Sequence, residues 1–343
     1  MRVLVSAPYP NPGGFPSLPK ASLYRPLARS FRDLVPGMSS KDVWLHSFDP
    51  RKVEPLSHDD LPLIVITHND IKLIRSFIAH YRHLGVTRFL CVDDVSDDGT
   101  REFLSGQADV DLYTSNVRYK TACRGRLWRQ MLVARYGGNR WYMSVDPDEF
   151  LVYSGYETVA LPSLIEALAQ RGVLHFPAPM LDMYPPGRVG EADYDGGGDE
   201  PPWTVADLFD ATGYTLRGDE RSWKIEGGVR HRVFGSRVQL IKYPLVYWGA
   251  MTNLNKNVHT PAPYWRNYAP LLGTLLHFKF FGDYWTQFKS TVANGQHFLN
   301  GAFYGDILQQ IDDPDRLVLE SDVSAPFIGA DDLIQRGFFS NWS

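Results

Sequence analysis

The chain has 343 residues, of which 44% are hydrophobic and 22% are charged. This length is enough to bury a substantial core, and the composition is typical of a folded, water-soluble protein. The formal net charge of −4 excludes a general electrostatic attraction to nucleic acid or to anionic membranes.

The chain carries two cysteines, Cys91 and Cys123. Two are too few for a disulfide framework and are typical of a reducing compartment. The first residues lack the long apolar run of a signal peptide, and no stretch approaches the roughly 18 apolar residues of a membrane span. We therefore expect a cytoplasmic protein, for which a lipid-linked substrate would require only peripheral contact with the inner face of the membrane.

The first predicted elements form a strand–helix–strand unit. Residues 1–58 are rich in Pro, Gly and Ser and show no sustained period, so we expect an irregular extension there. The apolar run LPLIVIT at 61–67 predicts a buried strand, apolar residues recur at helical spacing over 71–84, and 88–92 predicts a second buried strand. The right-handed crossover rule makes these two strands parallel.

The same alternation continues more loosely toward the C-terminus. Strands are predicted at 110–114, 141–145 and 173–176, and helices near 127–132 and 164–170. A loop rich in Gly and Asp follows at 187–202, and two further apolar segments lie at 238–248 and 271–281. This order of elements predicts an α/β fold.

Polar residues follow three of the predicted strands, and an open α/β sheet binds its ligands at the carboxyl ends of its strands. The sharpest of these segments contains Asp146 and Asp148, one residue apart after an apolar strand. Two carboxylates in this position can share one hard cation, and Mg²⁺ or Mn²⁺ takes such oxygens together with substrate phosphates. The sequence therefore predicts a divalent metal site.

Several motifs, in order, resemble the family-2-like bacterial glycosyltransferases of the GT-A fold, in the branch with an Asp-x-Asp-Glu motif. They read THND (67–70), VDDVSDDGT (92–100), DPDEF (146–150), PMLDMYPPG (179–187), GGVRHRVF (227–234), KYPLVYW (242–248) and LLHFKF (275–280). The resemblance implies a Rossmann-like mixed sheet flanked by helices over residues 59–293. A nucleotide-sugar half would cover 59–155, an acceptor half 156–293, and a helical tail 294–343.

The resemblance also implies a donor site. Thr67 and Asn69 would line the nucleoside pocket, and Asp93 or Asp94 would accept a hydrogen bond from the base or ribose. Asp146 and Asp148 would reach the metal and the donor diphosphate. A basic stretch precedes them, and its best candidates for contact with the diphosphate are Lys120 and Arg126.

Two histidines and three carboxylates are further candidates. A late histidine often completes the metal shell of GT-A enzymes, and either His259 or His277 could do so, because imidazole is a reasonable ligand for Mn²⁺. The alternative for each is a hydrogen-bonded core histidine. An inverting transfer also needs a general base, normally a carboxylate. Asp182 is the first candidate, with Glu226 and Glu149 as alternatives.

The function expected from this resemblance is transfer of a sugar, with inversion, from a nucleotide-sugar donor. A UDP-sugar is favoured as donor, and the acceptor would be a glycan or lipid-linked hydroxyl in surface polysaccharide synthesis. One rival is a sugar nucleotidyltransferase, which would need a Gly-rich basic loop after the first strand, where this chain has Thr67 to Asp70. Another is a non-catalytic nucleotide- or glycan-binding protein, which would bind donors without turnover.

Overall fold

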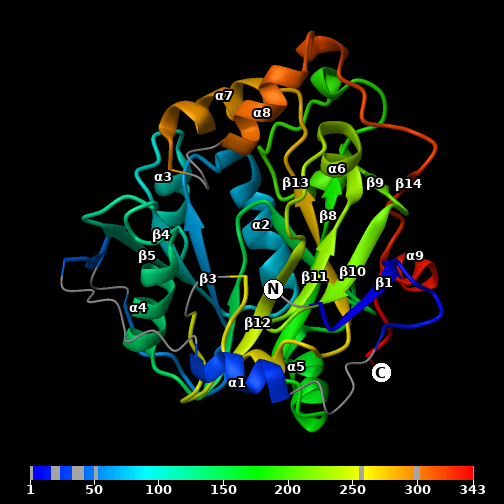
Figure 1. Cartoon of the computed structure of the whole chain (residues 1–343). Helices are drawn as coiled ribbons and strands as arrows, with labels where there is room; N and C mark the ends of the chain where they lie inside the picture. The colour runs from blue at the N-terminus through cyan, green and yellow to red at the C-terminus, as the bar shows by residue number, and fades with distance from the viewer. Residues whose placement is uncertain are drawn as a thin grey trace.

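The structure is a computed structural model that describes residues 3–16, 24–32, 42–49, 53–254, 259–296 and 302–342. A nine-stranded mixed sheet forms its centre, in the order β2-β5-β4-β3-β6-β12-β8-β13-β7 (Figure 1). Helices flank this sheet, as the α/β prediction requires, and the predicted fold class is confirmed.

The half of the sheet that contains β3 to β6 consists of parallel strands. They are β3 (Pro62–Thr67), β4 (Arg88–Asp93), β5 (Val110–Ser115) and β6 (Arg140–Ser144), with the short β2 (Leu45–Ser47) antiparallel at the edge. The connecting helices are α2 (Ile71–His83), α3 (Thr100–Ser105) and α4 (Arg126–Tyr136). Every residue of β3 is buried, which explains why its sequence is continuously apolar and does not alternate.

The other half is mixed. Its strands are β12 (Ile241–Trp248), β8 (His175–Met183), β13 (Gly273–Phe278) and β7 (Glu149–Tyr153), and α5 (Leu161–Gln170) precedes β8. Strand β12 is antiparallel to both β6 and β8, and β13 is parallel to β8. The carboxyl ends of β3, β4, β6, β8 and β13 therefore meet at one edge, where β12 begins. Figure 1 shows α7 (Tyr284–Asn294) and α8 (Ala302–Gln310) at that edge.

Smaller elements cover one side of the mixed half. Strands β1 (Val5–Tyr9), β10 (Tyr214–Gly218) and β11 (Trp223–Glu226) form a second sheet, and β9 (Leu208–Asp210) pairs with β14 (Ser324–Pro326). The remaining helices are α1 (Tyr24–Arg32), α6 (Gly228–Phe234), α9 (Ala330–Arg336) and the 3-10 turns Val189–Glu191, Pro202–Thr204, Tyr264–Arg266 and Pro314–Arg316.

The two ends of the chain lie together on this side. The Tyr9 ring packs edge-on against Phe338, and its hydroxyl donates to the Phe338 carbonyl at 2.7 Å. The described part of residues 1–58, predicted to be irregular, thus includes β1, α1 and β2, and residues 294–343 contain β14 as well as helices. The domain boundaries expected at residues 58 and 293 stay a prediction. One apolar cluster contains residues on both sides of each boundary, from Tyr9 to Phe339.

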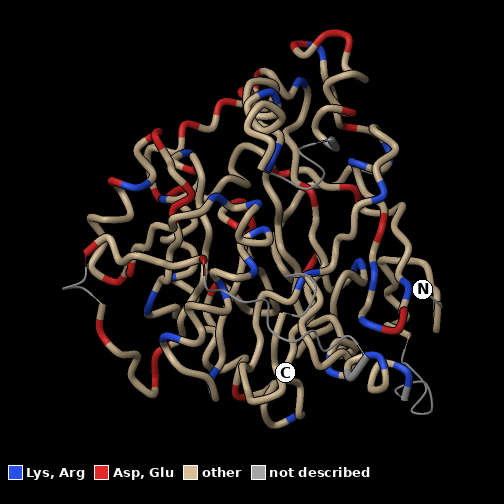
Figure 2. The backbone as a smooth tube through the Cα atoms, turned by 60° about the vertical axis from the view of Figure 1, so that its left-hand side comes forward, with Lys and Arg blue, Asp and Glu red and all other residues tan. Residues whose placement is uncertain are grey.

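Charge is distributed without separation by sign. Figure 2 shows basic and acidic residues interspersed along the backbone, as the small net charge suggests. Within the described ranges, no helix is long and apolar enough to cross a membrane.

Candidate metal and nucleotide site

The turn at residues 146–149 links β6, in the middle of the sheet, with β7 at its edge. The Glu149 N–H donates to the Asp146 carbonyl at 3.1 Å, and the Asp146 N–H donates back to Glu149 Oε2 at 3.1 Å. This tight turn carries three carboxylates to the edge where β8 and β13 end and β12 begins.

Asp146, the first acid of the motif, is bound by two cations. Arg129 Nη2, from α4, donates to its Oδ1 at 3.0 Å, and Lys242 Nζ, from the start of β12, donates to Oδ2 at 2.6 Å. Burial alone would raise the pKa of Asp146, but the charges of Lys242 and Arg129 outweigh it and hold this pKa well below its usual range. Both carboxylate oxygens of Asp146 are thus occupied by protein cations.

Glu149 is buried beside the same lysine, and its carboxylate forms an ion pair with Lys242. Burial and the nearby Asp146 and Asp148 charges raise the pKa of Glu149 to about 7, although Lys242 opposes the shift. Tyr81, on α2, donates to the Glu149 carbonyl at 2.9 Å. These contacts fix Glu149 within the turn.

Asp148 has 17% of its side chain exposed, less than the 35% of Asp146. Lys279 Nζ lies 2.5 Å from Oδ2, and His277 Nε2 lies 3.5 Å from the same oxygen. Burial would raise the pKa of Asp148, but Lys279 and His277 lower it overall. The acid is therefore ionised and faces both an ammonium and an imidazole.

His277 lies on β13 between two acid-bearing strands. The register pairs His277 with Glu149 on β7 and with Asp182 on β8. Its Nδ1 is 2.6 Å from Asp182 Oδ1, and Arg230 Nε donates to Asp182 Oδ2 at 2.7 Å. Burial raises the pKa of Asp182, but Arg230 and His277 outweigh it and hold this pKa well below the usual range.

Asp148, Glu149 and His277 form a cluster that could hold a metal ion, since one ligand atom from each lies within 4.8 Å of the others. Bonds of about 2.1 Å to one ion, at angles of about 90° to 110°, separate two donor atoms by about 3.0 to 3.4 Å. The 3.5 Å between His277 Nε2 and Asp148 Oδ2 is close to that separation. Two carboxylates and one imidazole suit Mn²⁺, so these residues fit a divalent ion once Lys279 turns away from Asp148 and Lys242 from Glu149.

The other predicted metal ligands lie beside this cluster. Asp146 faces Arg129 and Lys242 and is not a member of the triad. His259 is half-buried and also outside the triad. Burial lowers the pKa of His259 to about 3; the charges of Lys242 and Arg129 act in the same direction, and that of Asp146 opposes them.

The three candidate bases all have cationic partners. Asp182 contacts Arg230, Glu149 contacts Lys242, and Glu226 forms an ion pair with Arg217 across β10 and β11. A base role for any of them stays a prediction.

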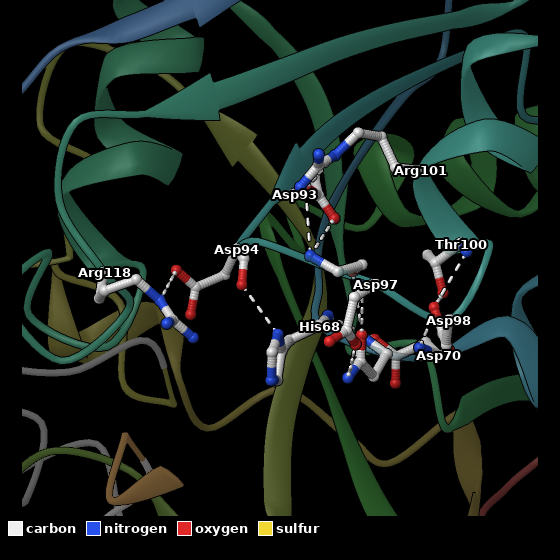
Figure 3. A network of polar contacts seen from close by, with 11 residues as sticks. His68, Asp70, Asp93, Asp94, Asp97, Asp98, Thr100, Arg101 and Arg118 are labelled. Carbon is white, nitrogen blue, oxygen red and sulfur yellow. Dashed lines mark hydrogen bonds and ion pairs between the residues drawn. The ribbon is translucent and has the colours of Figure 1, made fainter.

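The predicted nucleoside residues gather at the ends of β3 and β4 (Figure 3). Asp93 is buried and accepts from Arg101 Nε at 2.7 Å and from the Ser96 N–H. Asp94 accepts from Arg118 Nε at 2.9 Å, and its carbonyl is 2.8 Å from His68 Nδ1. Asp94 is buried as well, but 39% of the Arg118 side chain is exposed, so a ligand would meet this pair through the arginine. Asp93 stabilises the loop.

The remaining predicted donor contacts vary in accessibility. Asn69 adopts a positive φ of 58° and exchanges two hydrogen bonds with Asp97, so its amide is already occupied. Thr67 is fully buried. Lys120 is exposed, and Arg126 is half-buried with Nη1 donating to the Leu254 carbonyl at 3.3 Å.

Four basic residues pair with the acids of the site: Arg129, which belongs to the predicted basic stretch, and Arg230, Lys242 and Lys279, which were not singled out from the sequence. Each pairs with one acid or two, so four carboxylates and four cations balance in this cluster. The last three stand inside the motifs that carry the family resemblance, which was the available signal. A metal and a diphosphate could enter together with little change in net charge.

Glycines precede the two helices that carry two of these arginines, in places where a side chain would clash. A Cβ on Gly125, just before α4, would lie 2.1 Å from Ile66 and 2.7 Å from Arg129 Nη1. A Cβ on Gly227, just before α6 with its Arg230, would lie 2.4 Å from the Gly213 carbonyl, and φ is 137°. Both positions require glycine.

No protein-family model matches the sequence, and no curated protein matches it. Among solved structures, the chain is similar to a Bacillus anthracis protein described as a glucose-1-phosphate thymidylyltransferase, in complex with sucrose. The TM-score is 0.24 and the identity 8%, over 43% of this chain and 67% of that chain. A likeness of this size concerns the fold alone and carries no argument about activity.

Proposed function

We propose that the protein is a metal-dependent glycosyltransferase that moves a sugar from a nucleotide-sugar donor, a UDP-sugar by preference, to a hydroxyl of a glycan or lipid-linked acceptor. The observation that carries this proposal is the Asp148–Glu149–His277 cluster. It lies at the edge where parallel strands end, which is where α/β sheets bind nucleotides. The resemblance of the sequence motifs adds the reaction class.

In this proposal Asp148 and His277, with Glu149, hold Mn²⁺ or Mg²⁺. When bound, the ion would neutralise charge that develops on the leaving nucleoside diphosphate. Lys279 lies 2.5 Å from Asp148 and would turn from that carboxylate toward the diphosphate. Lys242 and Arg129 keep Asp146 ionised and fixed beside the site. Asp94 and Arg118 would contact the nucleoside, and transfer with inversion in surface polysaccharide synthesis follows the family pattern.

The test is calorimetric binding of UDP, GDP, CDP and dTDP with Mn²⁺ and with EDTA, to the wild-type protein and to Asp148→Asn and His277→Ala. Asp109→Asn is a matched control, because Asp109 pairs with Arg82 on the surface. We expect one nucleotide to bind only with metal, and both site variants to lose this binding while the control keeps it.

Turnover is measured with the sugar conjugates of the nucleotide that binds. Release of the diphosphate, with a product anomer opposite to the donor's, supports inverting transfer. Equal, metal-independent binding of all four nucleotides contradicts the proposal. Formation of a nucleotide sugar from a sugar phosphate and a nucleoside triphosphate would identify a nucleotidyltransferase instead.

A further inference from the structure

Behind His277, on the side away from Asp148, lies a buried acid. His277 and Asp182 are direct partners in the register of β13 and β8. His277 Nδ1 is 2.6 Å from Asp182 Oδ1, while His277 Nε2 faces Asp148 at 3.5 Å. The two ring nitrogens thus point in opposite directions, one into the fold and one into the candidate metal site.

Arg230 holds the second oxygen of Asp182. Its Nε donates to Asp182 Oδ2 at 2.7 Å, and α6 carries it there directly after Gly227. Asp182, His277 and Arg230 are only 3%, 4% and 6% exposed. An acid enclosed in this way cannot reach an acceptor hydroxyl without displacing its partners, which is a poor arrangement for a general base.

We propose that Asp182 is a positioning residue for His277: it accepts the Nδ1–H and so keeps the Nε2 lone pair directed into the metal site. This inference rests on the proposed function and replaces the base role expected for Asp182. A carboxylate paired with a guanidinium has no proton to donate, so the imidazole must donate at Nδ1. Histidines that bind metals commonly donate their other ring N–H to a carboxylate, which fixes the ring and its tautomer.

The chain offers a matched control in a second buried acid. Asp210, on β9, accepts from Arg232 Nε at 2.9 Å and Nη2 at 2.8 Å, and from the Tyr184 hydroxyl at 2.6 Å. Like Asp182, it is a buried strand residue paired with an arginine of α6. Among the described residues, its side chain contacts Arg232 and Tyr184 but no histidine. Asp210→Asn therefore removes a comparable buried charge without a histidine contact of this kind.

The first experiment measures the tautomer of His277 in the metal-free protein by ¹⁵N NMR with labelled histidine, assigned through His277→Gln. We expect the proton on Nδ1 in the wild-type protein. In Asp182→Asn the amide oxygen stays with Arg230 and its NH₂ faces the ring, which forces the ring proton to Nε2. An Nε2–H tautomer in the wild-type protein overturns the proposal, even if every variant at Asp182 fails to fold.

The second experiment records Mn²⁺ binding and the ¹⁴N coupling of bound Mn²⁺ by pulsed electron paramagnetic resonance. We expect ¹⁴N coupling in the wild-type protein and in Asp210→Asn. In Asp182→Asn we expect its loss, with Mn²⁺ affinity lowered about 10- to 100-fold. A folded Asp182→Asn protein with unchanged ¹⁴N coupling and affinity overturns the positioning role. Wild-type protein that binds no Mn²⁺ overturns the proposed metal-dependent function, while the tautomer result still decides the role of Asp182.

Discussion

The two halves of the candidate site differ in how far apart their partners lie in the sequence. At the ends of β3 and β4, Asp93 pairs with Arg101 and Asp94 with Arg118, over 8 and 24 residues. Around the 146–149 turn, Asp146 pairs with Arg129 over 17 residues. It also pairs with Lys242 over 96 residues, and Asp148 pairs with Lys279 over 131. The first half is assembled by one strand–helix–strand unit, whereas the second requires the whole sheet to form.

This difference has an energetic consequence. Removing one partner of a buried ion pair leaves a charge without compensation, so the turn depends on distant strands both for its shape and for its charge balance. The half at the ends of β3 and β4 should tolerate substitution better, because backbone N–H groups also contact Asp93 and Asp94.

The largest effect is expected for Lys242→Met, which leaves Asp146 and Glu149 without their shared cation. We expect this change to lower the free energy of unfolding by about 3 to 5 kcal/mol, measured by chemical denaturation. Lys289→Met, at an exposed lysine on α7, should stay within about 0.5 kcal/mol. A loss for Lys242→Met no greater than for this control would show that the turn does not depend on β12.

The next effect is on metal affinity. Asp148→Asn removes the most accessible ligand of the triad, and we expect Mn²⁺ to bind at least about 100-fold more weakly, or about 2.7 kcal/mol. Isothermal titration with Mn²⁺ measures this directly. Affinity unchanged from that of Asp109→Asn would move the metal away from the triad.

A third prediction concerns how acid lowers the free energy of unfolding through His80, which contacts β7, the strand that follows the turn. His80 is buried, bonds the Leu151 carbonyl of β7 through Nε2 at 2.9 Å, and burial lowers its pKa from 6.5 to about 4. Between these values acid protonates the unfolded chain before the folded one, so stability present above pH 6.5 is lost as the pH falls toward 4. For His80 alone the loss is about 2 kcal/mol at pH 5.

His80→Gln should therefore flatten the decline of the denaturation midpoint between pH 6.5 and pH 4. The exposed His58 provides the control, since His58→Gln should leave the decline unchanged. Identical pH profiles for wild-type and His80→Gln proteins would refute the assigned shift.

The smallest effect is expected at the ends of β3 and β4, where the proposed nucleoside contacts lie. Asp94→Asn weakens the contact with Arg118 and should lower nucleotide affinity about 10-fold, or about 1.4 kcal/mol, without changing the affinity for Mn²⁺ alone. Calorimetry with the preferred nucleotide, in parallel with Mn²⁺, separates the two. Equal loss of metal binding would show that the halves are not independent.

The sequence predicted the local half of this arrangement well. The expected strand at 61–67, helix at 71–84 and strand at 88–92 correspond to β3, α2 and β4, and every end agrees within one residue. Continuous apolar runs and helical periodicity are local signals. The two strands are almost wholly buried, and one face of α2 is buried. The strand predicted at 173–176 is β8, which begins at His175 and extends to Met183. Its second half was not predicted as a strand, because it lies within the motif at 179–187.

The sequence could not show how the second half is assembled. Strand β7 was not predicted, because its residues 149–153 directly follow the turn and the motif DPDEF (146–150) includes the first two of them. The pairing of Asp182 with His277 depends on the register of strands 95 residues apart. Asp182 lies at a strand end, which suggested a catalytic base. Its contact with His277 on β13 changes that interpretation.

The central claim is that a divalent metal binds at Asp148 and His277 beside a nucleoside diphosphate. Anomalous X-ray scattering at the manganese edge, from crystals soaked with Mn²⁺ and UDP, tests it most directly. We predict one strong peak within bonding distance of Asp148 and His277, with the diphosphate next to Lys279. A peak elsewhere, or UDP bound with Lys279 still on Asp148 and no metal, would contradict the account.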